Sequence, residues 1–156
     1  MNAFVTVFYD WSRQFASYLT WLAPLAVRIT VGWVFMGTGW TKLTHLPMIV
    51  QNFRGLGIPA PEVITPFVSG VEFFGGLLLL LGLLTRFAAV PLMVVMVVAI
   101  VSAKAGDIDS IETLLGFEEV SYFVMFAWLA IAGPGPVSLD HLILKASGRD
   151  PAVHGS

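Results

Sequence analysis

The chain has 156 residues, of which 57% are hydrophobic and only 12% are charged. Soluble domains carry about 25% charged residues, and a soluble chain this apolar could not cover its surface with polar atoms. The sequence contains no cysteine, which excludes disulfides, thiolate nucleophiles and Cys-ligated zinc or iron–sulfur centres within the chain. No basic block accompanies the formal charge of −2, so nucleic acid is not an expected partner.

The first segment, residues 1–18, is predicted to form an amphipathic helix. Its aromatic residues recur at helical spacing: Phe4, Phe8, Trp11, Phe15 and Tyr18. This pattern is typical of an interfacial helix that lies on a membrane surface. The alternative is a helix that extends the first membrane span into water.

Four stretches are long and apolar enough to cross a bilayer, which takes about 20 residues. In chain order they cover approximately residues 20–40, 61–84, 87–103 and 120–135. Each backbone amide in hydrocarbon needs a partner within its own segment, so each stretch is expected to be a helix. We therefore predict an all-α fold, in which residues 1–156 form a single transmembrane domain, a four-helix bundle with short interfacial helices.

The connections between the predicted spans set the topology. The link Thr85–Arg86 is so short that the second and third spans must form an antiparallel hairpin. Residues 41–60 contain an amphipathic stretch that predicts a short interfacial helix, ended by glycines and a proline. In the acidic connection before the fourth span, Asp109 and Glu112 resemble a capping box. Residues 145–156 are a polar C-terminal tail.

The side of the membrane follows from the distribution of basic residues. Four spans place both termini on one side, and that side carries Arg13, Arg86, Lys145 and Arg149. The opposite side carries Lys42, Arg54 and Lys104. Because cytoplasmic segments are enriched in Lys and Arg, we predict a multi-pass protein of the bacterial plasma (inner) membrane with cytoplasmic termini.

Two charged residues interrupt the apolar spans, Arg28 in the first and Glu72 in the second. Each would cost about 2.5–3.5 kcal/mol at a helix centre if it stayed unpaired. Arg28 lies about 18 Å below Trp40, and Glu72 about 16 Å from Pro61, so the two are expected to meet at similar depth. The pair either fixes the helix register or lines a polar pocket that opens toward Lys42 and His45.

Other residues suit a pocket or an anchor. Trp33 and Trp40, with Phe35 and Phe73 near them, could form the walls around an apolar ring. Arg86 and Asp140 are predicted to form a structural ion pair that ties the end of the fourth span to the hairpin. No metal site is predicted, because His45 and His141 follow spans of opposite direction and belong to opposite membrane faces.

Four segments in this order resemble the DoxX family of small bacterial membrane proteins, in a match over roughly Ala23–His141. They are RITVGWVFMGTGWTKL (Arg28–Leu43), GLGIP (Gly55–Pro59), EFFGGLLLLLGLLTR (Glu72–Arg86) and GPGPVSLD (Gly133–Asp140). The resemblance implies a four-helix membrane bundle related to the membrane subunit of a thiosulfate:quinone oxidoreductase. Relatives are described as parts of membrane oxidoreductase complexes that handle sulfur or oxidative stress. By resemblance, the recurrent polar positions of the family fall on Arg28, Lys42, Glu72, Arg86 and Asp140.

The leading hypothesis is a membrane subunit of a redox-associated system that binds quinone or another small molecule near the Arg28–Glu72 pair. Lys42 and Arg28 would supply positive charge, and Glu72 would take or give a proton. The cofactor is open, with quinone the candidate, and an enzyme role is open because the chain holds no redox centre of its own. Beyond the lipid bilayer, the expected partners are a soluble redox or sulfur-transfer enzyme, or further copies of the chain.

The alternative is a non-catalytic membrane scaffold that recruits a soluble partner enzyme or self-assembles. Its docking surface would be the acidic connection or the C-terminal tail. A small transporter is a third hypothesis, but the sequence lacks the paired broken helices that are typical of alternating access.

Overall fold

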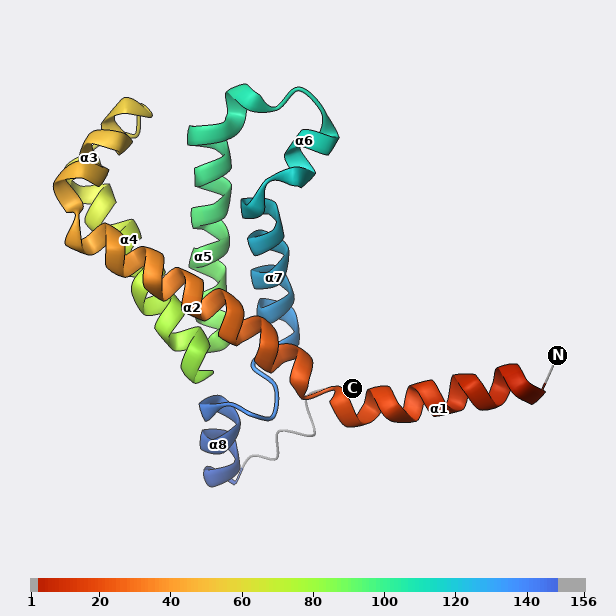
Figure 1. The fold of residues 1–156 in the computed structure, drawn as a ribbon. Coiled ribbons are helices and arrows are strands. Elements are labelled where there is room, and N and C mark those ends of the chain that lie inside the picture. Colours follow the sequence, from red (N-terminus) through yellow and green to blue (C-terminus); the bar gives the residue numbers. More distant parts are fainter. Residues whose placement is uncertain (1–2, 149–156) are drawn as a thin grey trace.

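The computed structural model describes residues 3–148, which form helices and connecting loops without a strand among them. Four helices build the bundle: α2 (Leu22–Thr44), α4 (Pro61–Leu81), α5 (Thr85–Ala99) and α7 (Glu118–Ala132) (Figure 1). α2 packs mainly against α4 and α5 mainly against α7, while α4 and α5 contact each other. The predicted all-α fold is confirmed.

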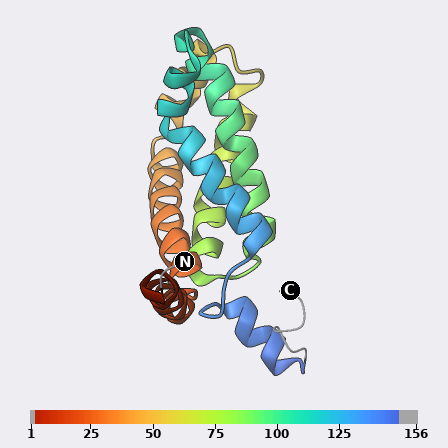
Figure 2. The same ribbon diagram turned by 90° about the vertical axis from the view of Figure 1, so that its right-hand side faces the viewer.

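Short helices lie at both ends of the bundle. α3 (Leu46–Gly55) and α6 (Ile111–Gly116) lie at one end, and α1 (Ala3–Leu19) and α8 (Leu139–Ala146) at the other (Figures 1 and 2). The helices expected within residues 1–18 and 41–60 are therefore present, and their contact with a membrane interface stays a prediction. The part of the predicted polar tail after Gly148 lies outside the described residues.

Three helical segments are long and apolar enough to cross a membrane: α2, α4 and the continuous segment Thr85–Asp107. The last consists of α5, a π-helical turn (Ile100–Lys104) and a 3-10 turn (Ala105–Asp107). The fourth predicted span forms α7, whose 15 residues reach about 22 Å, less than the roughly 30 Å of a hydrocarbon core. A bilayer crossing by α7 stays a prediction.

Asp140 ties the start of α8 to the turn between α4 and α5. Its carboxylate accepts hydrogen bonds from the backbone N–H groups of Leu84 (2.8 Å) and Thr85 (3.1 Å), and its own N–H donates to the carbonyl of Gly82 (2.9 Å). These bonds satisfy N–H groups at the start of α5, which have no partner within the helix. The predicted attachment to the hairpin is correct, but the predicted Arg86–Asp140 ion pair is wrong among the described residues. The carboxylate is engaged by backbone donors, and the Arg86 guanidinium lies beside Gly133 instead.

The start of α6 differs from the prediction by one residue. Ser110, not Asp109, is the N-cap, and its hydroxyl accepts a hydrogen bond from the N–H of Thr113 (3.2 Å). Asp109 accepts a bond from the Thr113 hydroxyl (2.5 Å), which lowers the pKa of the Asp109 carboxyl below its usual value. A short helix does follow, as expected.

Two glycines set the register between α2 and α4. A Cβ atom on Gly39 would lie 2.3 Å from the backbone nitrogen of Phe73, and one on Gly76 would lie 2.4 Å from that of Met36. The two backbones therefore touch at these points, as small residues allow in membrane helix pairs. Gly39 thus lies opposite Phe73, which determines the depth of every charge on the two helices.

Candidate functional site

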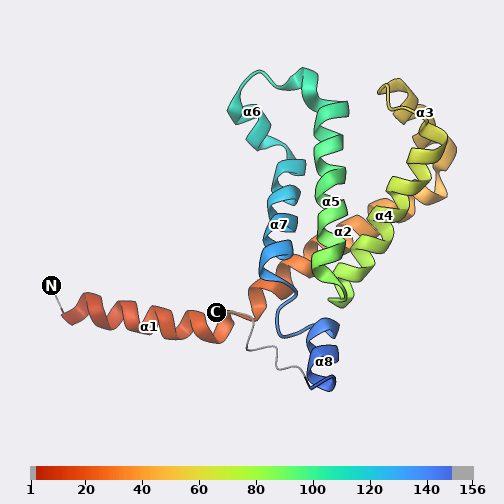
Figure 3. The ribbon, with the colours of Figure 1, turned by 180° about the vertical axis from the view of Figure 1, so that it is seen from behind.

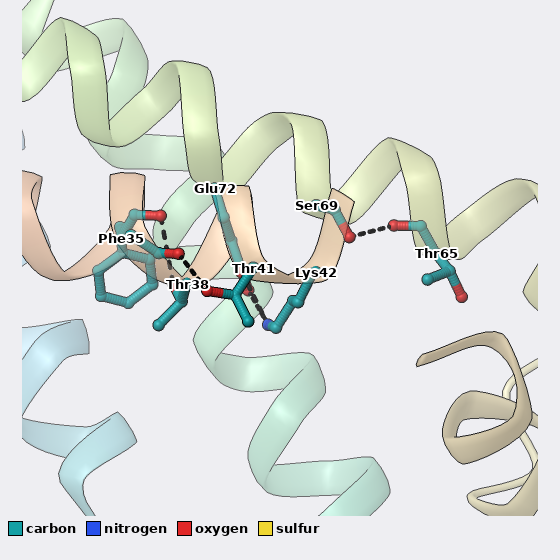
Figure 4. A network of polar contacts seen from close by, with 8 residues as sticks. Phe35, Thr38, Thr41, Lys42, Thr65, Ser69 and Glu72 are labelled. Atoms are coloured by element: carbon teal, nitrogen blue, oxygen red, sulfur yellow. Dashed lines mark hydrogen bonds and ion pairs between the residues drawn. The ribbon is translucent and has the colours of Figure 1, made fainter. Parts of the chain in front are cut away.

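The central feature of the site is an ion pair between α2 and α4. The Lys42 ammonium donates to both carboxylate oxygens of Glu72, each at 2.7 Å (Figure 4). The Glu72 side chain is 3% exposed and that of Lys42 is 30% exposed, so the pair extends from the interior to the surface. Thr65 and Ser69 continue the buried polar face of α4 beyond Glu72.

The predicted Arg28–Glu72 pair is wrong. Arg28 is buried, but it donates from Nε to the Leu79 carbonyl (3.0 Å) and from Nη1 to the carbonyls of Pro134 (2.6 Å) and Val137 (2.9 Å). Its partners thus come from the end of α4 and from the segment between α7 and α8. Arg28 therefore holds the end of the bundle that carries α1 and α8 (Figure 1).

The helix register explains this difference. The sequence argument aligned Trp40 with Pro61, but α2 continues to Thr44 and its Gly39 lies opposite Phe73. Arg28 lies three helical turns before Gly39, about 16 Å along the axis. The residue that reaches Glu72 is therefore Lys42, less than one turn beyond Gly39.

A cavity of about 180 Å³ adjoins the Lys42–Glu72 pair. It is lined by residues of all four bundle helices: Val34, Phe35, Thr38, Lys42, Glu72, Met96, Glu118, Glu119 and Tyr122. Lys42 lies near the end of α2, and Glu118 and Glu119 lie in the first turn of α7, so this part of the cavity lining is toward the end of the bundle that carries α3 and α6. The arrangement of these helices can be followed in Figures 1 and 3. Converging polar groups beside aromatic and aliphatic side chains are a common feature of small-molecule sites.

Part of the cavity wall is aromatic and aliphatic, from Val34, Phe35, Met96 and Tyr122. Phe35 is in edge contact with Tyr122 and with Phe126, with ring centroids 5.2 and 4.9 Å apart. Phe126 and Met96 belong to the buried core, so these contacts hold the ring of Phe35 in place. A flat apolar ligand could lie against Phe35 and Tyr122 with one edge toward Lys42.

The other predicted ligand residues lie elsewhere. Trp33 and Trp40 are 67% and 58% exposed, and neither lines the cavity. Trp40 packs on Phe73, with ring centroids 5.7 Å apart. His45 is exposed at the end of α2, where its Nδ1 lies 2.9 Å from the Thr41 carbonyl. Of the residues predicted to form the site, the structure brings Lys42, Glu72 and Phe35 to the cavity.

The sequence argument missed the contribution of α7 to the cavity. Glu118 and Glu119 precede the predicted fourth span, and both line the cavity with Tyr122. Glu119 accepts a bond from the Lys104 ammonium (2.8 Å), which also lies 4.9 Å from the ring centre of Phe117. The available signal was the spacing of Glu118, Glu119 and Tyr122, which can share one face of the first helical turns.

Comparisons with known proteins agree on the family. The DoxX family profile matches residues 23–105. The chain is 35% identical to the uncharacterized membrane protein Rv3486 of Mycobacterium tuberculosis over 78% of this chain and 81% of the relative. It is 30% identical to the inner membrane protein YqjF of Escherichia coli over 78% of this chain and 92% of that relative. It is 25% identical to the Bacillus subtilis protein named "Putative oxidoreductase CatD" over 80% of this chain and 89% of that relative.

No solved structure matches the chain. The family profile covers more than half of the residues, and two relatives at or above 30% identity match over most of their own length. Both are named as membrane proteins, in accord with the three apolar helices found here. The predicted resemblance is confirmed, and the chain is a membrane protein that belongs to the DoxX family.

Proposed function

We propose that the chain is the membrane subunit of a redox-associated system and binds a quinone, or a similar uncharged ring, in the cavity beside Lys42 and Glu72. The observation that carries this proposal is the ion pair of the buried Glu72 carboxylate with Lys42, beside a cavity that Phe35 and Tyr122 also line. Intramembrane charges are costly, and they are retained most often where they bind or transfer something. The name of one relative, CatD, includes oxidoreductase, which supports a redox setting.

Each residue of the pair has a distinct task in this proposal. The Lys42 ammonium would donate a hydrogen bond to a ring oxygen, while Phe35 and Tyr122 hold the ring faces. Glu72 would hold or release the proton that accompanies reduction of the ring. The electrons would come from a soluble redox or sulfur-transfer enzyme, because this chain has no cysteine to hold a thiol relay or an iron–sulfur centre.

Ligand binding competes with the existing ion pair. Lys42 has three donor hydrogens and already contacts both oxygens of Glu72. A ring oxygen at the cavity edge would take the remaining donor or replace one carboxylate contact. Because 30% of the Lys42 side chain is exposed, the ammonium can shift toward a ligand without leaving water entirely.

The test is menadione binding to the purified protein in lipid nanodiscs, measured by calorimetry. We expect Glu72→Gln to weaken binding about tenfold, about 1.4 kcal/mol, because Lys42 is then no longer held at the cavity edge. Glu62→Gln is the matched control, since Glu62 lies on the same helix but pairs with Arg54 on the surface. Its affinity should equal that of the wild type.

Equal affinity of the wild type and folded Glu72→Gln would contradict the role of the pair. Absence of menadione binding to the wild type would contradict the site as a whole. Either result would favour the non-catalytic scaffold, in which the pair only fixes the contact between α2 and α4.

A further inference from the structure

The charges that line the cavity are unbalanced. Three carboxylates reach it, from Glu72, Glu118 and Glu119, against the single ammonium of Lys42. Lys42 is bound to Glu72 through both oxygens. Glu119 is bound at 2.8 Å to Lys104, from the π-helical turn after α5.

Glu118 differs from the other two carboxylates. It has no ion-pair partner within residues 3–148, and it is exposed on the first turn of α7. The two ion pairs cancel their own charges, which leaves the carboxylate of Glu118 as the surplus charge of the cavity. An anion that enters meets this negative charge, and the charge of each lysine is already balanced by the carboxylate that it binds.

We propose that the cavity admits uncharged and cationic molecules and rejects anions, and that Glu118 is the residue that determines this preference. That the ligand is an uncharged ring rests on the proposed function. The charge preference rests only on the residues that line the cavity. It follows that a sulfur oxyanion would not be bound beside Lys42. Any such substrate would be handled by the partner enzyme.

The absence of cysteine from the chain allows a direct measurement. Thr38 lines the cavity, and its hydroxyl bonds only to the Phe35 carbonyl of its own helix, so Thr38→Cys places one thiol there (Figure 4). This variant is reacted with the cationic reagent MTSET and the anionic reagent MTSES. Each rate is divided by the rate of the same reagent with free 2-mercaptoethanol, which removes intrinsic reactivity.

After this division, we expect Thr38→Cys to react about fivefold faster with the cationic reagent than with the anionic reagent. This preference should fall as salt is added, because salt screens the charge of Glu118. Adding Glu118→Gln should bring the ratio close to that of the free thiol, and Glu118→Lys should invert it. Adding Glu112→Gln is the matched control, because it removes the same charge from an exposed position on α6 outside the cavity. That variant should keep the full preference.

A ratio equal to that of the free thiol, or one that does not change in Glu118→Gln, would overturn the proposal. The thiol reaction does not require quinone binding, so this experiment tests the charge preference independently of the proposed function. If menadione fails to bind while the rates differ as expected, quinone binding is wrong and the charge preference stands. If menadione binds and the rates are equal, the charge preference is wrong and the binding site stands.

Discussion

Two basic side chains of α2 are buried in different ways. Arg28 is 2% exposed and directs its donors to three backbone carbonyls from two other segments. Lys42 remains partly exposed and is bound to one carboxylate. The planar guanidinium has five donors in a fixed geometry and can satisfy several carbonyls at once, whereas an ammonium is a compact point charge. Arg28 therefore has the character of a structural clamp, and Lys42 that of a group that can change partner.

Arg28→Lys tests this distinction at the residue scale. The shorter reach and different shape of lysine should break at least one of the three carbonyl contacts, at about 1.5–3 kcal/mol for each bond to a charged group. We expect a lower thermal unfolding temperature in detergent, and unchanged menadione affinity in the folded fraction. Arg13→Lys, on exposed α1, is the control and should leave the unfolding temperature unchanged. Equal unfolding temperatures for the two variants would contradict the clamp.

At the scale of the elements, the contact between α2 and α4 determines which charges meet. Gly39 and Gly76 bring the backbones together, and this contact places Lys42 rather than Arg28 beside Glu72. Lys42 and Glu72 from this helix pair line the cavity together with Met96 of α5 and Tyr122 of α7. The site thus depends on a steric contact made by residues without side chains.

Gly76→Ala should disrupt that contact. The added Cβ would lie 2.4 Å from the backbone nitrogen of Met36, so α2 and α4 must move apart. We expect a lower unfolding temperature, because the overpacked contact should reduce the free energy of unfolding by about 1–3 kcal/mol. Menadione binding should also weaken, because Lys42 moves relative to Glu72. Gly70→Ala is the control on the same helix, since its Cβ meets nothing within 4 Å. Alanine favours a helix more than glycine does, so Gly70→Ala should not lower the unfolding temperature, and equal losses in both variants would contradict the role of the contact.

At the scale of the whole molecule, the two ends differ. One end carries α1 and α8, and the other carries α3, α6 and the mouth residues Glu118 and Glu119 (Figure 2). We propose that α1 lies on the cytoplasmic membrane surface, with the face that contains Phe15 toward lipid and the face that contains Ser17 toward water. The cavity would then open toward the opposite side of the membrane.

Single cysteines in this cysteine-free chain test both parts of that proposal. In spheroplasts, a membrane-impermeant maleimide should label Ile111→Cys, on α6, and should label Ser17→Cys only after lysis. In lysed membranes, Phe15→Cys should react several-fold more slowly than Ser17→Cys, because lipid shields it. Labelling of Ser17→Cys in intact spheroplasts would reverse the orientation. Equal rates for Phe15→Cys and Ser17→Cys would place α1 in water.

The class of protein, its helices and their order can be predicted from composition and apolar runs. Long apolar runs in a chain with few charges can satisfy their backbone only as helices in lipid, so composition was sufficient. The positions of α2, α4 and α5 agree with the predicted spans within a few residues, and the cost of burying the Glu72 charge predicts that it has a partner, which is Lys42. The family resemblance depended on local motifs, which the sequence shows directly.

Which charges meet depends on how the helices pack against each other. Arg28 and Glu72 were paired by assuming that the helix ends align, but the relative shift of two helices depends on side-chain sterics that periodicity does not reveal. A close backbone contact at Gly39 and Gly76 shifted the register, so Lys42 reached Glu72 and Arg28 met carbonyls after α7. The contribution of Glu118 to the cavity was hidden for the same reason, because it depends on how α7 packs against helices distant in sequence.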